Sequence, residues 1–248
     1  MTRSTGRPET ACRIGTAGWS VPKGGEGSQL HRYSARFDCV EINSSFYRPH
    51  RPRTYARWAE SVPAGFRFAV KAPRALTHEA RLRDAAPLLR AFLAEIAGLG
   101  PALGPLLVQL PPSLKFELAL AQSFFADLRG LFAGEVVAEP RHPTWFGADA
   151  ETLLAAHEVG RVAADPAPVP EAASPGGWRA LRYWRMHGSP QMYHTAYGED
   201  RLRALADRLA PRDWCIFDNT ASGAALQDAL RLQNLIPPSA RITGAAEG

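Results

Sequence analysis

The chain has 248 residues, of which 46% are hydrophobic, and it carries a formal net charge of +5 with a sequence pI near 9.4. No apolar stretch approaches the roughly 20 residues that a membrane helix requires, and the polar N-terminus lacks the apolar region of a secretory signal, so no membrane partner is expected. The three cysteines, Cys12, Cys39 and Cys215, are far apart and odd in number, which predicts reduced thiols in a cytoplasmic protein.

Eight short apolar runs recur along the chain, and most of them end in a charged or hydrogen-bonding residue. Strands of a parallel sheet are buried on both faces, and polar groups gathered at one end of such strands indicate a barrel with its site at the C-terminal mouth. The pattern predicts an α/β fold, a single-domain (β/α)8 TIM barrel. The expected strands are Arg13–Gly18, Phe37–Asn43, Arg67–Lys71, Leu106–Gln109, Val136–Arg141, Arg161–Asp165, Leu181–His187 and Trp214–Asn219.

Helical patterns separate most of these strands, because apolar residues recur there at helical spacing. The segment Asp165–Gly177 is rich in proline and glycine, so an irregular loop is predicted in place of the sixth crossover helix. Residues 1–12 are expected to form a disordered arm, residues 13–236 the barrel, and residues 237–248 a flexible tail. The expected helices are Ala86–Gly98, Glu117–Leu128, Ala148–His157, Glu199–Leu209 and Ser222–Leu235.

Alternation along a strand places every second side chain on the same face. If one such face points inward, the upper barrel contains a ring of carboxylates, cations and one imidazole. An ionisable group inside a strand is costly unless it is paired or used, so this ring is either a site or a layer of ion pairs. The residues that share a face are Cys39, Glu41 and Asn43; Ala69 and Lys71; Val137, Glu139 and Arg141; and Tyr183, Arg185 and His187.

Seven segments, taken together and in order, resemble the DUF72 family of YecE-like proteins. The resemblance implies a TIM-barrel fold over nearly the whole domain; because the family name records an unknown function, it implies no particular activity. The segments are GTAGWS (Gly15–Ser20), VEINSSFYRPH (Val40–His50), FAVKAPRALTH (Phe68–His78), LLVQLPPS (Leu106–Ser113), EPRHPTWF (Glu139–Phe146), RMHGSP (Arg185–Pro190) with a following Tyr197, and FDNTASGAA (Phe217–Ala225).

Four residues are the candidates for catalysis. Glu41 and Glu139 act as general acid and base if their surroundings separate their pKa values; the alternative is structural ion pairs, Glu41 with Lys71, and Glu139 with Arg141 or Arg185. Lys71 is a fixed cation for a carboxylate or phosphate, or else a desolvated lysine that serves as a Schiff-base nucleophile or a proton carrier. His187, at the end of the seventh strand, is a proton carrier or a satisfied structural histidine.

Other side chains at the strand ends are expected to bind the ligand. Aromatic rings in these loops stack on a sugar or a base, or else seal the barrel top as core, and the neutral hydrogen-bonding groups orient a polar ligand or satisfy buried backbone. The expected ligand-binding residues are Trp19, Asn43, Tyr47, Gln109, Arg141, Trp145, Asp165, Arg185, Gly188, Tyr197 and Asn219.

A metal site is the lesser alternative for the same ring. Its oxygen-rich donors with one nitrogen would be Glu41, Glu139, Asp165, His187 and Asp218. Such donors suit a divalent cation, but Lys71, Arg141 and Arg185 already balance their negative charge. No metal ligand and no cofactor are therefore assigned.

Arginines cluster after the second strand (Arg48, Arg51, Arg53, Arg57) and after the third (Arg74, Arg81, Arg83). They form solvated helix faces or a cationic rim that attracts anions. We expect the barrel to bind or act on a small anionic, hydroxyl-bearing ligand, a phosphosugar or nucleotide, by acid/base chemistry, as a lyase, isomerase or hydrolase if it is an enzyme. The alternative is a nucleic-acid-binding or processing protein, an endonuclease IV-like barrel with or without a metal. The oligomeric state stays open.

Overall fold

The computed structural model describes residues 12–236. Its strands form two sheets, one with the order β1–β10–β9–β7 and the other with the order β2–β3–β4–β5–β6–β8. All pairs of neighbouring strands run parallel except β6 and β8. The strands are β1 (Arg13–Thr16), β2 (Cys39–Ile42), β3 (Arg67–Lys71), β4 (Leu103–Gln109), β5 (Val136–Glu139), β6 (Val159–Arg161), β7 (Ala163–Asp165), β8 (Gly176–Gly177), β9 (Tyr183–Met186) and β10 (Trp214–Phe217).

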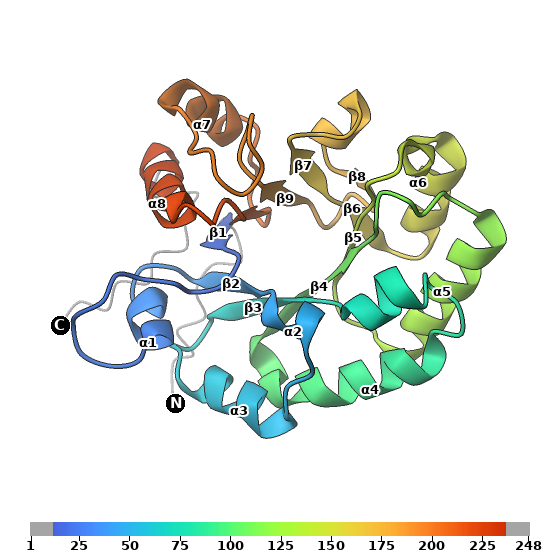
Figure 1. Cartoon of the computed structure of the whole chain (residues 1–248), viewed down its shortest axis with the longest axis horizontal. Coiled ribbons are helices and arrows are strands. Elements are labelled where there is room, and N and C mark those ends of the chain that lie inside the picture. Colours follow the sequence, from blue (N-terminus) through green and yellow to red (C-terminus); the bar gives the residue numbers. More distant parts are fainter. Residues whose placement is uncertain (1–11, 237–248) are drawn as a thin grey trace, which may run out of the picture.

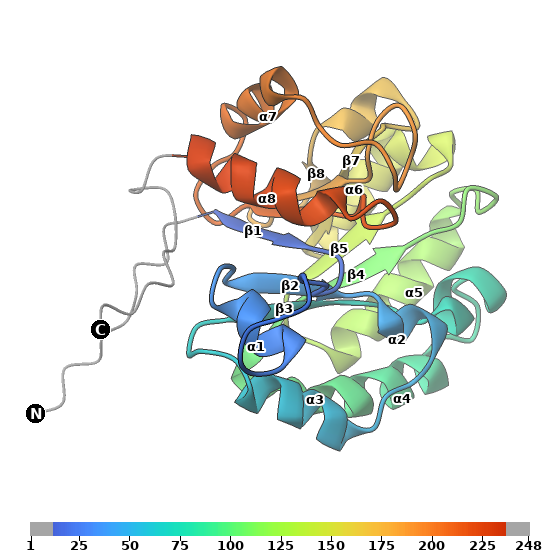
Figure 2. The ribbon, with the colours of Figure 1, turned by 60° about the vertical axis from the view of Figure 1, so that its left-hand side comes forward.

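Helices lie around the outside of the strands (Figure 1). In Figure 2, α8 lies over β1, and α3 and α4 lie on the other side of β2 and β3. The α-helices are α1 (Gln29–Ser34), α2 (Ser44–Tyr47), α3 (Pro52–Glu60), α4 (Ala86–Ile96), α5 (Leu118–Leu131), α6 (Ala148–Ala156), α7 (Glu199–Ala206) and α8 (Ala224–Leu235). Shorter helical turns are η1 (Ala75–Glu79), η2 (Ala97–Ala102), η3 (Pro143–Phe146) and η4 (Pro170–Ala173).

The predicted helices are confirmed within a few residues at each end. In α5 the buried residues Ala121, Phe124, Phe125 and Leu128 follow the spacing of one helical face. Proline stands in the first turn of α3 and of α4, where its missing N–H costs no hydrogen bond. Proline therefore favours the start of α3 and α4, and the buried apolar face of α5 determines which side of that helix packs toward the strands.

The strands do not form one closed barrel, and this corrects the expectation of a continuous (β/α)8 barrel. β1 and β2 are joined by an isolated bridge between Ala17 and Glu41 rather than by a ladder. The sixth predicted strand, Arg161–Asp165, is interrupted at Val162, whose N–H donates to the Ala138 carbonyl. Arg161 ends β6, which pairs with β5, and Ala163–Asp165 form β7, which pairs with β9. The result is a mixed α/β, TIM-barrel-like arrangement in two parallel-dominated sheets.

The sixth crossover is irregular, as predicted. Between β7 and β9 the chain forms the short turn η4 and the two-residue strand β8, which pairs antiparallel with β6. The chain that connects two neighbouring parallel strands normally crosses over through a helix that covers the sheet. Here a loop takes its place, so part of the outer face of β7 and β9 lacks the usual helical cover.

Two apolar cores hold the strands in position. The larger one lies between strands and helices. The smaller one fills the space enclosed by the strands and consists of Cys39, Ala69, Leu107, Val137, Val162, Leu181, Tyr183, Trp214 and Ile216. A Cβ on Gly104 would come within 2.8 Å of the Trp214 ring, so glycine is needed there to admit the indole. The polar side chains described below lie next to this inner core, toward the C-terminal ends of the strands.

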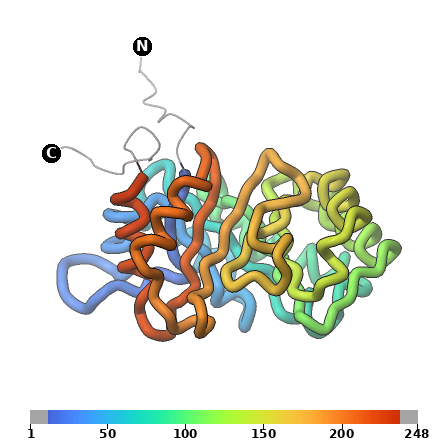
Figure 3. Tube along the Cα trace, turned by 90° about the horizontal axis from the view of Figure 1, so that it is seen from above, coloured from blue at the N-terminus to red at the C-terminus, as the bar shows by residue number. Residues whose placement is uncertain are grey.

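The first and last elements of the described chain lie side by side, with α8 packed against β1 (Figure 3). Within residues 12–236, no helix has both the length and the apolar character required to cross a membrane. Of the predicted N-terminal arm only Cys12 belongs to the described part, and it is buried; the predicted tail, residues 237–248, lies outside it. Cys12, Cys39 and Cys215 are free thiols, and a cytoplasmic location stays a prediction.

Candidate functional site

A layer of charged side chains lies directly above the inner apolar core. Each member stands two residues further along a strand than a member of the core, so strand alternation places both on the same inward face. The pairs are Cys39 with Glu41, Ala69 with Lys71, Val137 with Glu139, Tyr183 with Arg185, and Ile216 with Asp218. The predicted inward ring of carboxylates and cations is therefore present, at the C-terminal ends of the strands.

The Arg185 guanidinium is the centre of this layer and is fully buried. Its Nη2 and Nε donate to the two Glu41 oxygens at 2.6 and 3.1 Å, its Nη1 donates to Glu139 Oε2 at 2.7 Å, and its Nη2 also reaches Asp218 Oδ2 at 3.0 Å. Tyr183 adds a fifth contact by donating to Glu41 Oε2 at 2.8 Å. Planar, multidentate pairing of this kind is the strongest use of arginine against carboxylates.

Burial by itself disfavours the charge on Arg185, but Glu139, Glu41 and Asp218 outweigh it and raise the pKa of the guanidinium well above its usual range. The neighbouring Tyr183 phenol has a pKa raised well above its ordinary value, first because it is buried and second because Glu41 lies against it. Arg185 therefore stays charged and Tyr183 stays a donor. Glu41 has its oxygens taken up by these two residues, and the alternative pairing of Glu41 with Lys71 does not form.

His187 joins two of the carboxylates. Its Nδ1 lies 3.1 Å from Asp218 Oδ2, and its Nε2 lies 2.7 Å from Glu139 Oε1. Arg141 Nη2 lies 2.7 Å from both His187 Nε2 and Glu139 Oε1. A protonated imidazole donates to both carboxylates, whereas a neutral ring with its proton on Nδ1 accepts from Arg141 at Nε2. The contacts of His187 thus accommodate two protonation states without moving the ring.

The two carboxylates that contact His187, Glu139 and Asp218, are held ionised. Burial raises the pKa of Glu139, but Arg141, Arg185 and His187 outweigh it and hold the value well below its usual range. For Asp218, burial is likewise outweighed by Arg185 and His187, so its pKa is lowered. The Asp218 side chain is 10% exposed, against 1% for Glu139 and none for Glu41. Among these carboxylates Asp218 is therefore the one that a molecule entering the mouth meets first.

Lys71 is the cation of the layer that has no carboxylate partner within residues 12–236. Its Nζ lies 4.2 Å from the centre of the Phe46 ring, and the residue is 7% exposed. Burial, followed by the charge of Arg185, lowers its pKa to about 8, although Glu41, Glu139 and Asp218 act in the opposite direction. A cation–π contact stabilises an ammonium group without neutralising its charge, so Lys71 keeps a charge that is available to a ligand.

Two further polar atoms in contact with the layer are buried without a hydrogen-bond partner. They are Oδ1 of Asn43, an acceptor, and Nε of Arg141, a donor. Asn43 Nδ2 lies 3.4 Å from Asp218 Oδ1, so this amide is joined to the same network. Native structures rarely leave such groups unpaired. Together, the Arg141 donor, the Asn43 acceptor and the Lys71 ammonium group are complementary to a ligand that has both oxyanion and hydroxyl groups.

Other expected ligand-binding residues support the loops around the layer. A Cβ on Gly188 would come within 2.8 Å of the Thr195 carbonyl, and its φ of 90° is in the left-handed region, so glycine is needed there. Tyr197 is buried; its hydroxyl accepts from the Gly188 N–H and donates to the Asp165 carbonyl. Asn219 Nδ2 donates to the Thr195 carbonyl and to Asp228. Tyr197 and Asn219 therefore contact the protein's own chain, holding the loop after β9.

The structure does not bring several other expected residues into the layer. Asp165 forms an ion pair with Arg201 of α7 at 2.7 Å, on the outer face of β7. Trp145 is buried, and its indole N–H donates to the Leu114 carbonyl. Trp19 packs edge-on against Trp58, and Tyr47 is 77% exposed. Gln109, by contrast, stands opposite Glu139 in the register of the sheet and two residues after Leu107 of the inner core, so it shares the inward face of the layer.

Two residues in or beside the layer were given no catalytic or ligand-binding role from the sequence. Asp218 was considered as a possible metal ligand, and Tyr183 as a neighbour of Arg185 on one face. Phe46 of α2, which lies against Lys71, is one of the aromatic residues at the mouth that were expected to stack on a ligand or to seal the barrel top. Strand alternation is sufficient to find Asp218 and Tyr183.

The donor set does not fit a metal site in its present arrangement. No group of three His, Cys, Asp or Glu side chains in the described part of the chain is placed to hold a metal ion. Glu41, Glu139 and Asp218 all accept hydrogen bonds from Arg185, so a cation would first have to displace the guanidinium. Dependence on a divalent metal stays the lesser prediction.

A second cationic region lies on the surface, and we call it the arginine hollow. It is an open hollow of about 640 Å³ lined by Arg48, Pro49, His50, Arg51, Arg53, Thr54 and Arg57. The four arginines have no ion-pair partner within residues 12–236. The exposed ring of Tyr47 immediately precedes this segment in the chain. Part of the predicted cationic rim is thus gathered around one concave surface.

Comparison with known proteins gives a consistent result. The family described as "Protein of unknown function DUF72" matches residues 13–246. The UPF0759 protein YecE of Escherichia coli is 36% identical over 170 residues, which are 65% of this chain and 61% of that protein; the chain thus matches less than two thirds of this relative's length. The UPF0759 protein YunF of Bacillus subtilis is 34% identical over 74 residues, covering 27% of this chain and 26% of that protein.

Solved structures agree with this match at the level of the fold. A DUF72 family protein from Thermotoga maritima has a TM-score of 0.77 at 24% identity, covering 91% of this chain and 98% of its own. One from Enterococcus faecalis has a TM-score of 0.76 at 21% identity, covering 91% and 97%. The structure described as SacUVDE has a TM-score of 0.56 at 8% identity, covering 91% and 98%, which is a likeness of fold alone.

Proposed function

The chain belongs to the DUF72 family, and we propose that the charged layer at the C-terminal mouth of its TIM-barrel-like fold binds a small anionic, hydroxyl-bearing ligand, a phosphosugar or a nucleotide, and acts on it by acid/base chemistry. The observation that carries the proposal is the ammonium group of Lys71, which stands without a carboxylate partner above a network in which the neighbouring charges are paired. A buried cation of this kind is stabilised when an anion arrives.

The pairing of charges in the layer favours an anion at Lys71. Glu41, Glu139 and Asp218 supply three negative charges and all pair with Arg185, while Glu139 also pairs with Arg141. Lys71 adds a positive charge that none of these three carboxylates pairs with. In the proposal, Lys71 and the unpaired Nε of Arg141 contact the anionic group, and Oδ1 of Asn43 accepts from a ligand hydroxyl.

Acid/base chemistry in this proposal runs through Asp218, His187 and Glu139. Asp218 is the most exposed of the three carboxylates and receives the proton of a ligand hydroxyl. Its lowered pKa makes it a weak base alone, so the proton passes to the unprotonated Nδ1 of a neutral His187, 3.1 Å away, whose Nε2–H donates to Glu139. Glu41, whose oxygens are occupied by Arg185 and Tyr183, positions Arg185 rather than exchanging protons.

Calorimetric titration with ribose phosphate, glucose phosphate and AMP tests the binding part of the proposal. We expect at least one of them to bind, and Lys71→Met to weaken that binding about tenfold or more, since one lost charge contact is worth roughly 1.4 kcal/mol. Lys115→Met, which removes an exposed lysine that is not a member of the layer, is the matched control. Equal affinity in Lys71→Met and the wild type, or no binding of any of the three ligands, would contradict the proposal.

The pH dependence of that affinity gives a second test. Because the pKa of Lys71 is lowered to about 8, its positive charge is present below that pH and is lost above it. The affinity for the phosphorylated ligand therefore falls as the pH rises through about 8. Lys71→Arg keeps its charge in this range, so in that variant the affinity should stay level; an equal fall in both proteins would argue against Lys71 as the contact.

Nucleic-acid binding is the second candidate, and the arginine hollow is the observation that favours it. Unpaired arginines contact phosphates, and an exposed aromatic ring such as that of Tyr47 stacks on an unpaired base. Fluorescence anisotropy with labelled single-stranded DNA and RNA at low salt tests this candidate. The triple variant Arg48→Ala, Arg51→Ala, Arg53→Ala should lose binding, whereas Arg36→Ala, Arg90→Ala, Arg212→Ala should retain it. Absence of binding by the wild type at low salt removes the candidate.

A further inference from the structure

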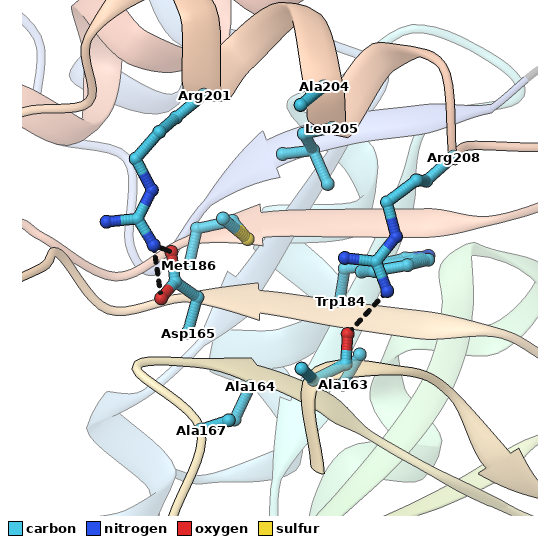
Figure 4. A pocket seen from close by; sticks show the side chains of 11 residues that line it. Ala163, Ala164, Asp165, Ala167, Trp184, Met186, Arg201, Ala204, Leu205 and Arg208 are labelled. Atoms are coloured by element: carbon cyan, nitrogen blue, oxygen red, sulfur yellow. Dashed lines mark hydrogen bonds and ion pairs between the residues drawn. The ribbon is translucent and has the colours of Figure 1, made fainter. Parts of the chain in front are cut away.

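The irregular sixth crossover leaves a cavity on the outer face of the sheet. Along β9, Tyr183 and Arg185 point inward, so the alternate residues Trp184 and Met186 point outward toward α7. A cavity of about 190 Å³ lies between these side chains and α7 (Figure 4). The rest of its lining is mostly small and apolar: Ala163, Ala164, Ala167, Ala173, Ala204 and Leu205. We call it the α7 cavity; the sheet separates it from the charged layer.

Polar side chains stand at the two ends of the α7 cavity, as Figure 4 shows. At one end Arg201 donates to both oxygens of Asp165, at 2.8 and 2.7 Å. At the other end the Arg208 guanidinium lies 4.7 Å from the centre of the Trp184 ring, and its Nη2 donates to the Ala173 carbonyl at 2.7 Å and to Ser174 Oγ at 2.8 Å. The Arg201 end is neutralised by Asp165, whereas Arg208 has no carboxylate partner within residues 12–236.

A second cavity, of about 360 Å³, adjoins the first, since Trp184 and Arg208 line both. Arg179 and Arg182 also line it, together with Ser174, Pro175 and Gly176, and its lining includes no carboxylate. Arg182 is paired with Asp213 at 3.3 Å. Arg179 is exposed and has no ion-pair partner in the described part of the chain. Like charges gathered in one hollow repel each other, and a bound anion removes that repulsion.

We propose that the two adjoining cavities form one binding site for an amphipathic organic anion, with its apolar group in the α7 cavity and its carboxylate between Arg208 and Arg179. The size of the apolar group follows from the volume: a dry cavity of about 150 Å³ accommodates benzene, so the α7 cavity suits one ring or a short alkyl chain. The site lies on the opposite side of the sheet from Lys71 and does not depend on the function proposed for the charged layer.

Phenylpropionate is the probe for this site, measured by calorimetry and by the shift of backbone amide signals in NMR. We expect saturable binding with a low-millimolar dissociation constant or tighter, the range available to a ligand of this size. Phenylpropanol has the same ring and chain without the charge, and acetate has the charge without the ring; each should bind about tenfold more weakly or worse. Equal binding of phenylpropanol, or no saturable binding of phenylpropionate, would overturn the proposal.

Two variants locate the bound probe. Ala204 is exposed at the rim of the α7 cavity, so Ala204→Trp can block the cavity without entering the core, and it should abolish binding. Arg179→Ala should weaken binding about fivefold, the effect of one partly solvated charge contact. Arg90→Ala, an exposed arginine on α4, is the matched control and should bind as the wild type does. Unchanged binding in both Ala204→Trp and Arg179→Ala would place the probe elsewhere and overturn the proposal.

Discussion

The charged layer and the arginine hollow both concentrate positive charge, but they do so under opposite physical conditions. Arg185 is fully buried, and its guanidinium contacts three carboxylates. The arginines of the hollow are exposed, and no carboxylate pairs with them within residues 12–236. Burial makes an unpaired charge costly, whereas water tolerates it. The fold should therefore depend on the first set of charges and hardly at all on the second. Lys71 is the exception, since it is buried and unpaired.

Removing the central guanidinium should have the largest effect. Arg185→Met leaves Glu41, Glu139 and Asp218 buried without their common donor, so we expect the free energy of unfolding to fall by about 3–5 kcal/mol. Urea denaturation measures it. Arg182→Met, three residues earlier and half-buried, is the control and should cost much less. A loss below about 1 kcal/mol for Arg185→Met would mean that the layer is not a structural network.

Acid should destabilise the protein through the same layer. The pKa values of Glu139 and Asp218 are lowered in the folded state, so the stability that they contribute is present above their unfolded values, roughly pH 4, and is lost as the pH falls through the folded values. The free energy of unfolding should be level from neutral pH to roughly pH 5 and then decrease. Denaturation curves of Glu139→Gln should show a shallower decrease; an unchanged slope would contradict this assignment.

Lys71 should behave in the opposite sense. Its folded pKa, about 8, lies below its unfolded value, so the unfolded chain holds the proton more tightly and the charge opposes folding at neutral pH. Lys71→Met should raise the free energy of unfolding at pH 7 by about 1–3 kcal/mol, and the gain should shrink as the pH rises above 8. Lys115→Met should change little. A destabilised Lys71→Met would show that Lys71 is part of the structural network after all.

The smallest effect is expected in the arginine hollow. Each of Arg48→Ala, Arg51→Ala and Arg53→Ala should change the free energy of unfolding by less than about 0.5 kcal/mol, as surface substitutions do. Thermal denaturation at low and high salt checks it. If the triple variant is clearly more stable at low salt, mutual repulsion of the arginines is the cause; a clear loss of stability would mean that these arginines have structural partners and would break the comparison.

Alternation in the sequence was enough to identify most of the charged layer. Glu41, Glu139, Arg141, Arg185 and His187 were expected to face inward together, and they do. The expected alternative partners of Glu139, Arg141 and Arg185, both pair with it. The partner of Glu41 was not predictable, because the candidates lie on different strands and a one-residue change of register alters every pair. Glu41 contacts Arg185 rather than Lys71, although its strand β2 pairs with β3, which carries Lys71.

Asp165 shows where position at a strand end is an insufficient guide. It ends β7, as predicted, but it shares a face with Ala163, whereas Val162 points into the inner core. Asp165 therefore faces α7 and pairs with Arg201. The interruption at Val162 also divides the strands into two sheets. The outward face of Asp165 and the interruption at Val162 have no local signal in the sequence. Both depend on which neighbouring strand pairs with each part of the sixth predicted strand.

The sequence by itself determined most of the elements and most of their faces. Apolar spacing set the helices, apolar runs set the strands, proline and glycine set the irregular sixth crossover, and alternation set which side chains share a face. Tertiary structure alone decided the contacts: the Arg185 network, the unpaired Lys71, the arginine hollow and the cavities under α7. The reason is physical. Propensity and periodicity act between residues a few positions apart, whereas ion pairing and cavities depend on distances between segments that only the folded chain brings together.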